Sequence, residues 1–189
     1  GVSDGSYINT GVVPGVERYP CSLATDLSGN IYATYFNGED SAAVRKYSPD
    51  GNLLLEVGSF GTGDGQFETP SDIHVDSSNN IFIVSDHRVQ RFSSDGVFIS
   101  SFSVAEDDSD TLAGVSSVSV DSSGSIYVSG AWGGDFNSSY PLVQKYSSDG
   151  VLTGQFINQV GSGTNQLAQG STLDLANDAS GNLYIVDTY

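Results

Sequence analysis

The sequence predicts an all-β protein made of repeated units, and two interleaved motifs carry this prediction. The first motif, D-x-S-[GN]-[NS]-[IL]-[YF], begins at Asp26, Asp76, Asp121 and Asp178. The second, V-x-[KR]-[YF]-S-x-D-G, begins at Val44, Val89 and Val143. The leading aspartates are 50, 45 and 57 residues apart (76−26, 121−76, 178−121). Such a period, with turns between short apolar runs, is typical of β-propeller blades.

Each repeat divides into four short strands, as the second one illustrates. Its expected strands are residues 72–75, 81–84, 89–92 and 97–102. A turn rich in Asp, Ser and Asn separates the first two strands, and these residues favour turns. The Asp95-Gly96 pair separates the last two strands and is a strong hairpin signal. The run 81–84 is apolar on both faces, as expected for a strand buried between neighbouring blades. We expect Ile81 and the residues at its place in the other repeats to be buried; they are Ile31, Ile126 and Leu183.

The repeats predict one propeller domain over residues 1–189. We place its blades at about 21–60, 71–103 and 115–157, with a partial blade at 172–189. Residues 1–20 are expected to form an outer strand and loop of an adjoining blade. Four-stranded antiparallel blades of about 45 residues give about four blade-lengths here, whereas six blades need about 270 residues. We therefore expect an incomplete arc of a larger, six-bladed propeller, with a closed four-bladed ring as the alternative.

The repeats resemble those of the NHL-repeat family of β-propellers. The resemblance is carried by the loop Gly61–Pro70, by the aspartate turns and by the V-x-[KR]-[YF]-S-x-D-G runs. Members of that family include extracellular lyases and hydrolases, RNA-binding or protein-binding proteins, and surface proteins. The resemblance thus implies a fold but leaves the activity open.

The charge of the chain argues against two classes of partner. The formal net charge is −17, with only six Lys and Arg residues. A nucleic-acid reader needs a basic face that neutralises phosphates, so we expect no nucleic-acid partner. No apolar run approaches the roughly 20 residues of a membrane span, so we expect no membrane insertion. The scarcity of lysine beside abundant Asp, Ser, Gly and Asn predicts an extracellular or cell-surface protein.

The variable loops should lie on one face of the arc, because the short aspartate and hairpin turns occupy the other. Function concentrates on variable loops over a rigid scaffold. The long loop 130–141 holds the only tryptophan, Trp132, with Asp135 and Tyr140. Exposed aromatic rings beside polar groups suit protein or glycan contact, so these three residues form the predicted ligand-binding site. Alternatively, Trp132 folds over its own loop.

Two further loop features are candidate sites. Asp107, Asp108 and Asp110 lie in an acidic loop whose hard oxygen ligands suit Ca²⁺, although a solvated acidic loop explains them as well. Asn137 begins an N-x-S triplet, an acceptor for N-glycosylation that also arises by chance. We expect no other cofactor.

The inner strands are expected to carry mostly small or apolar residues, with His74 as the exception to the repeat. An imidazole beside the channel suits metal ligation or proton transfer, and a hydrogen-bonded structural histidine is the alternative. The zinc-dependent amidating lyases of the NHL family use several channel histidines. Here His87 is the only other one, and it falls in a loop. Cys21 stands alone at the start of an inner strand, which predicts a small buried side chain.

Two functional hypotheses remain. The first is a non-enzymatic extracellular scaffold or binding module, with a surface-layer or filament subunit as one form. Incomplete blades leave open edges through which such a chain can self-assemble. The alternative is a fragment of a propeller-type lyase or calcium-dependent hydrolase.

Overall fold

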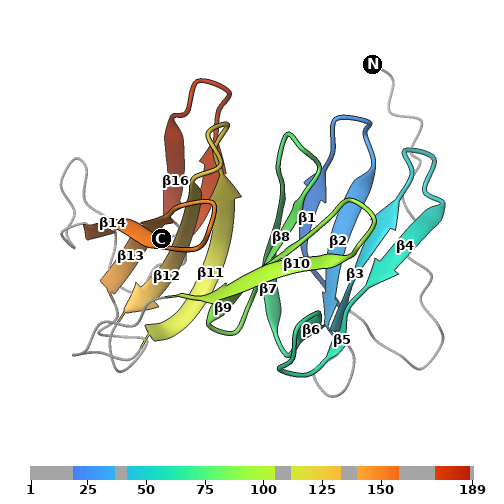
Figure 1. Cartoon of the computed structure of the whole chain (residues 1–189), viewed down its shortest axis with the longest axis horizontal. Helices are drawn as coiled ribbons and strands as arrows, with labels where there is room; N and C mark the ends of the chain where they lie inside the picture. Colours follow the sequence, from blue (N-terminus) through green and yellow to red (C-terminus); the bar gives the residue numbers. More distant parts are fainter. Residues whose placement is uncertain (1–18, 37–41, 105–111, 133–139, 158–172, 188–189) are drawn as a thin grey trace.

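The computed structural model describes residues 19–36, 42–104, 112–132, 140–157 and 173–187, and it places them in β-strands and tight turns (Figure 1). Three sheets are four-stranded and antiparallel, and a fourth has two strands. The described part of the chain contains no helix that could span a membrane. The predicted all-β fold and the incomplete arc of antiparallel blades are therefore confirmed.

The blades follow one another along the chain. Blade 1 comprises β1 (Tyr19–Thr25), β2 (Ile31–Phe36), β3 (Ala42–Tyr47) and β4 (Leu53–Val57). Blade 2 comprises β7 (Pro70–Val75), β8 (Ile81–Ser85), β9 (Arg88–Phe92) and β10 (Phe98–Ser103). Blade 3 comprises β11 (Leu112–Val120), β12 (Ile126–Trp132), β13 (Tyr140–Tyr146) and β14 (Leu152–Ile157). Blade 4 has β15 (Leu173–Asn177) and β16 (Leu183–Asp187). Between blades 1 and 2, β5 (Ser59–Phe60) and β6 (Gln66–Phe67) form a small parallel pair.

The aspartate turns close by hydrogen bonds within each motif. In the first turn, one oxygen of Asp26 accepts the amides of Ser28 and Asn30 at 3.0 and 2.9 Å. The other oxygen accepts the Asn30 side-chain amide at 2.8 Å and the Tyr32 hydroxyl at 3.2 Å. Gly29 has φ +78°, which a glycine adopts without strain. The hydrogen bonds that close the turn therefore come from residues of the motif itself.

A cation from the third strand covers the aromatic ring that follows each of the first three turns. The Lys46 ammonium lies 4.9 Å from the Tyr32 ring centre, and Lys145 lies 5.0 Å from that of Tyr127. In blade 2, the Arg91 guanidinium lies over Phe82. This contact explains why a cation recurs at one place in the second motif.

Apolar side chains fill the space between successive blades. The cluster between blades 1 and 2 includes Tyr32, Val44, Ile73, Ile81 and Ile83. The cluster between blades 2 and 3 includes Phe82, Val84, Val118, Val120, Ile126 and Val128. The cluster between blades 3 and 4 includes Tyr127, Val143, Leu175 and Leu183. The second strands of blades 2 and 3, β8 and β12, thus pack one face against the preceding blade and the other against the following blade.

Two expectations about burial need correction. The first residue of every second strand was expected to be buried, and Ile81 and Ile126 are, at 1 % exposure each. Ile31 and Leu183 are only half-buried. Ile31 faces away from blade 2, and Leu183 belongs to a two-stranded sheet that covers less of it. Cys21 is exposed rather than buried, because it lies in β1, the inner strand of the first blade of the described arc.

Candidate functional site on the inner strands

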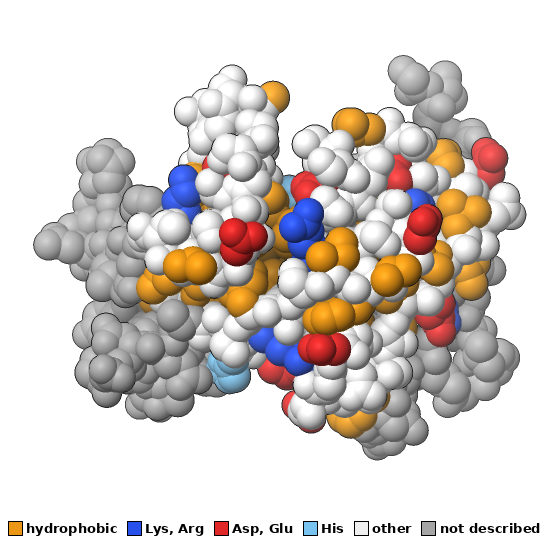
Figure 2. Space-filling view, in the orientation of Figure 1, with side chains coloured by type: hydrophobic (Ala, Val, Ile, Leu, Met, Phe, Trp, Pro, Cys, Tyr) orange, Lys and Arg blue, Asp and Glu red, His pale blue; other side chains and the backbone are white. Residues whose placement is uncertain are grey.

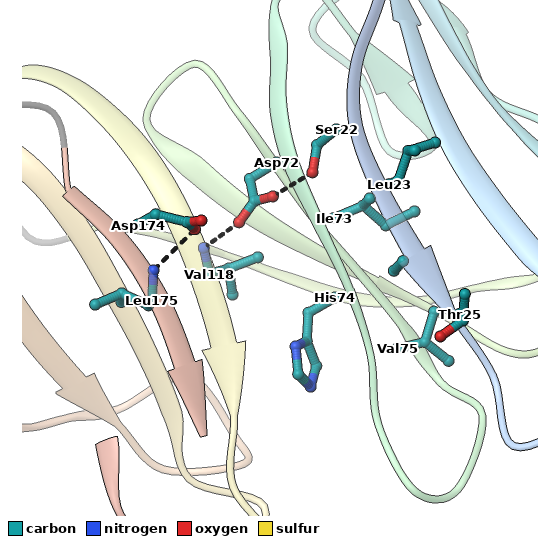
Figure 3. Close-up of a pocket in the computed structure, with 11 residues that line it drawn as sticks. Ser22, Leu23, Thr25, Asp72, Ile73, His74, Val75, Val118, Asp174 and Leu175 are labelled. Carbon is teal, nitrogen blue, oxygen red and sulfur yellow. Dashed lines mark hydrogen bonds between the residues drawn. The ribbon is translucent and has the colours of Figure 1, made fainter. Parts of the chain in front are cut away.

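The inner strands β1, β7, β11 and β15 line an open cavity of about 300 Å³ (Figure 3). Its polar lining includes Ser22, Thr25, Asp72, His74 and Asp174, and its apolar lining includes Val118 and Leu175. We call this space the inner cavity. Several polar groups from different blades converge on it, which makes it a candidate site.

Asp72 joins three blades at the edge of the inner cavity. Its Oδ1 accepts the Ser22 hydroxyl of blade 1 at 2.6 Å. Its Oδ2 accepts the Ser117 hydroxyl at 2.7 Å and the Val118 amide at 2.8 Å, both from blade 3. Both carboxylate oxygens are therefore used in contacts between blades.

A related contact joins blades 3 and 4. The Ser117 hydroxyl oxygen lies 3.0 Å from Asp174 Oδ1 and accepts the Leu175 amide at 3.2 Å. A hydroxyl carries one proton, so Ser117 donates to either Asp72 or Asp174 at a given moment. The Asp174 Oδ1 also accepts the Leu175 amide at 2.9 Å.

The four linking residues occupy one position of the repeat. Each lies four residues before a turn aspartate; they are Ser22, Asp72, Ser117 and Asp174. In β1, β7 and β11 the strand register shifts beside this position, at Pro20/Leu23, Pro70/Asp72 and Val115/Ser117. Such bulges re-aim groups that would otherwise serve the ladder within a sheet. The bulges therefore explain how side chains here reach the next blade.

His74 lies on β7, two residues after Asp72, and its ring faces the inner cavity (Figure 3). Burial lowers the pKa of His74 below its ordinary value. The carboxylates of Asp72 and Asp76 and a hydrogen bond with the Val120 backbone act in the opposite direction without cancelling the effect of burial. The ring is therefore held neutral and tied to blade 3.

The described residues contain no cluster of three or more His, Cys, Asp or Glu side chains arranged to hold a metal ion. The predicted Ca²⁺ ligands Asp107, Asp108 and Asp110 lie outside the described residues, as does the candidate glycosylation site Asn137. The Ca²⁺ and glycosylation sites therefore stay predictions.

The predicted ligand-binding loop is shorter than expected. The strand β12 extends to Trp132 and β13 begins at Tyr140, and these two residues pair across the ladder. The two aromatic residues thus belong to the ends of paired strands rather than to the loop predicted from the sequence. Asp135 lies outside the described residues. Strand pairing continues further because each added ladder pair satisfies backbone groups that a loop would leave to water.

The carboxylates of the inner strands were missed in the sequence. The lining of the inner cavity is mostly small or apolar, as expected, but it also presents Asp72 and Asp174. A signal for them exists: Ser and Asp alternate at the position four residues before each turn aspartate. That these residues form hydrogen bonds between blades becomes apparent only when the neighbouring blades are placed side by side.

No protein-family model and no curated protein matches this sequence. Solved structures do match its fold. A protein of unknown function from Bacteroides caccae is 14 % identical, with a TM-score of 0.61, over 91 % of this chain and 57 % of that chain. A catalytically inactive virginiamycin B lyase from Staphylococcus aureus, solved with quinupristin, is 11 % identical, with a TM-score of 0.59, over 93 % of this chain and 51 % of that chain.

A WD40 domain, that of Pan2 from Neurospora crassa, is 15 % identical, with a TM-score of 0.52, over 90 % of this chain and 43 % of that chain. WD40 repeats build propeller blades. This chain spans about half the length of the structures that it matches. At such low identity the likeness concerns the fold alone, and the chain is an arc of a β-propeller.

Proposed function

We propose that this chain is a non-enzymatic binding and assembly module built from NHL-like propeller blades, acting outside the cell or at its surface. The observation that supports it best is the use of the inner polar groups. Both oxygens of Asp72 are occupied by Ser22, Ser117 and Val118. A catalytic carboxylate needs a lone pair or proton directed at a substrate, whereas this one holds blades together.

The loop face of blade 3 is the proposed binding surface for a protein or glycan. The backbone pairing of Trp132 with Tyr140 brings the two aromatic residues to one end of the blade, and Asp135 lies in the segment between them. Aromatic residues beside a carboxylate are suited to sugar rings and to peptide contacts. The acidic residues 107–110 precede blade 3 in the sequence, and the triplet at Asn137 falls in the same segment as Asp135. Both fit an extracellular module that binds Ca²⁺ and carries a glycan.

The single tryptophan provides a direct test of this surface. A glycan array probed with the chain should reveal bound sugars, and titration of the best one should change the fluorescence of Trp132. Trp132→Ala should abolish array binding while the thermal unfolding midpoint stays close to that of the unaltered protein. Trp132→Phe is the matched control and should retain part of the binding. Array binding that Trp132→Ala leaves unchanged would place the site elsewhere.

A propeller-type lyase or hydrolase fragment is the second candidate, and His74 is the observation that favours it. Its neutral ring faces the inner cavity close to Asp72, so it has the protonation state of a general base. The fold of virginiamycin B lyase makes quinupristin a reasonable probe. The chain should be incubated with quinupristin and Mg²⁺ or Ca²⁺, and the products followed by mass spectrometry. The binding-module proposal predicts no turnover; turnover that His74→Gln removes would replace it with the enzyme.

A further inference from the structure

A tyrosine hydroxyl completes the aspartate turn of blades 1, 3 and 4. In blade 1, the Tyr32 hydroxyl donates to Asp26 Oδ2 at 3.2 Å and forms a second hydrogen bond with the Lys46 ammonium. The residues that form the same two hydrogen bonds in blade 3 are Asp121, Tyr127 and Lys145. Blade 4 repeats the bond from tyrosine to aspartate. The hydroxyl can join a cation to a carboxylate because it both accepts and donates.

Blade 2 has no hydroxyl at this position, because Phe82 stands where the other blades have tyrosine. Among the described residues, Asp76 Oδ2 accepts a single hydrogen bond, from the Asn80 side-chain amide at 2.8 Å. The Arg91 guanidinium lies over the Phe82 ring, 5.5 Å from its centre. Its Nε is buried and donates to no group in the described part of the chain. The carboxylate and the cation are therefore both present in blade 2, without the group that joins them elsewhere.

The same turn holds a second buried polar atom that is unique to blade 2. Asn79 stands where the other aspartate turns have glycine, and it keeps the left-handed backbone, with φ +61°. Asparagine tolerates this conformation better than most residues do. Its Oδ1 is buried and accepts no hydrogen bond from the described residues. Because buried polar groups are nearly always hydrogen-bonded, an unpaired donor and an unpaired acceptor in one blade point to a partner from outside the chain.

We propose that the aspartate turn of blade 2 binds an external hydroxyl group, at the place that a tyrosine hydroxyl occupies in the other blades. This group accepts a hydrogen bond from Arg91 and donates one to Asp76 Oδ2, and Asn79 Oδ1 is a further acceptor in the turn. The chemistry of the ligand follows from its two neighbours. A cation has no lone pair for the Arg91 guanidinium, and an anion would face the Asp76 carboxylate, whereas a hydroxyl satisfies both.

The hydroxyl comes from water or from an alcohol such as a polyol or a sugar. Phe82 is 3 % exposed, and the Asp26 side chain at the corresponding place of blade 1 is 4 % exposed, so the site is enclosed as buried water sites are. Arg91 is half-buried, which leaves a route for the hydroxyl of a larger molecule. The β7–β8 turn lies at the same end of the arc as the β1–β2 turn (Figure 1). This site is therefore distinct from the binding surface proposed around Trp132.

Two reciprocal substitutions test the site by crystallography without polyols in any solution. The unaltered protein should show an oxygen peak within about 3.2 Å of both Asp76 Oδ2 and Arg91. Phe82→Tyr supplies the hydroxyl covalently, so the peak should be absent from that variant. Tyr127→Phe removes the hydroxyl of blade 3, and a new peak should appear beside Asp121. A soak of the unaltered crystals in ethylene glycol distinguishes the two sources: a peak that stays a single oxygen is water, whereas density that extends into a glycol shows that the site takes an alcohol.

Thermal unfolding provides the corresponding measurement in solution. Phe82→Tyr should raise the unfolding midpoint by about 2–4 °C, because the hydroxyl finds a donor and an acceptor already in place. Phe60→Tyr is the matched control, since it adds a hydroxyl to a ring that is 39 % exposed, and it should leave the midpoint nearly unchanged. The proposal is overturned if the unaltered protein shows no peak between Asp76 and Arg91, if Phe82→Tyr leaves the peak in place, or if Phe82→Tyr lowers the midpoint. None of these results would affect the Trp132 or quinupristin assays.

Discussion

The Asp72 carboxylate and the Val118 amide, 2.8 Å apart, connect β7 to β11 across the boundary between blades 2 and 3. Because the same carboxylate accepts the Ser22 hydroxyl of blade 1, one side chain couples three blades. Figure 3 shows Asp72 between these two donors. The stability of the arc therefore depends on a residue that precedes its own turn by four positions.

Asp72→Ala should destabilise the protein far more than Ser22→Ala. The first change leaves the Val118 amide without its acceptor and removes the hydrogen bonds that the Ser22 and Ser117 hydroxyls donate to Asp72, which should lower the free energy of unfolding by about 3 kcal/mol. Ser22→Ala removes one hydrogen bond and should cost about 1 kcal/mol. Urea unfolding at neutral pH measures both. If both variants lose equally little free energy of unfolding, the contact between the blades does not depend on the Asp72 carboxylate.

Two glycines with the same backbone conformation should respond differently to alanine. Gly150 and Gly181 have φ of +79° and +83°, so each alanine bears the strain of a left-handed backbone. A Cβ at Gly150 would lie 2.6 Å from the Phe102 ring, whereas one at Gly181 meets nothing within 4 Å. We expect Gly181→Ala to cost about 1 kcal/mol from strain alone and Gly150→Ala about 3 kcal/mol from strain and overpacking. Thermal unfolding of the pair distinguishes the two contributions, and equal losses would mean that the Phe102 ring moves aside freely.

Asp26 should contribute stability that disappears in acid. Burial acts to raise its pKa, but hydrogen bonds from Asn30, Ser28 and Tyr32 outweigh it, and the pKa of Asp26 is lowered. A carboxyl group with a lowered folded pKa stabilises the protein above its unfolded pKa of about 3.9, and the contribution is lost as pH falls through the folded value. Asp26→Asn should therefore cost about 1–2 kcal/mol at pH 7, and the cost should shrink below about pH 4.

Urea unfolding of the Asp26 variant between pH 2 and 7 provides the measurement. Leu27→Ser, in the same turn, changes an 85 % exposed side chain that takes no part in these hydrogen bonds, and it should cause a small change that does not depend on pH. A cost for Asp26→Asn that stays constant over the whole range would contradict the expected linkage.

His74 should reduce stability in mild acid. Burial lowers its folded pKa, so protonation is less favourable in the folded protein than in the unfolded chain. The unfolded chain then binds more protons as pH falls below about 6.5, and the free energy of unfolding decreases in that window. His74→Gln should remove this decrease while the acid loss due to Asp26 persists. Chemical denaturation from pH 4.5 to 8 measures the free energy of unfolding of both proteins. If that free energy depends on pH in the same way with and without His74, the pKa of His74 is not lowered in the folded protein.

The surface adds an observation about the outer strands. Figure 2 shows apolar side chains along the face formed by blades 1 to 3. Exposed apolar residues recur just after the hairpin turns, and they are Leu53, Leu54, Val97, Ile99, Val151 and Leu152. Because they recur in every complete blade, they are a property of the repeat.

The sequence alone determined the elements that close locally. The aspartate turns are predictable because the hydrogen-bond donors that close the turn on Asp26, from Ser28 to Tyr32, lie within six residues of it. The strand order within each blade follows from the same proximity, since Asp-Gly hairpins join neighbouring strands. The propeller fold was therefore readable from the repeat.

Only the tertiary structure decided which residues act between blades. Asp72 and Ser117 are far apart in the chain, and nothing local to either indicates that they meet. The end of β12 at Trp132 depends likewise on its pairing with β13. Tyr127 and Tyr184 stand at the same place in the same motif, yet one is buried at 7 % exposure and the other is 55 % exposed. A motif determines its own turn through short-range hydrogen bonds, whereas burial is a property of the neighbouring blade, which the motif does not encode.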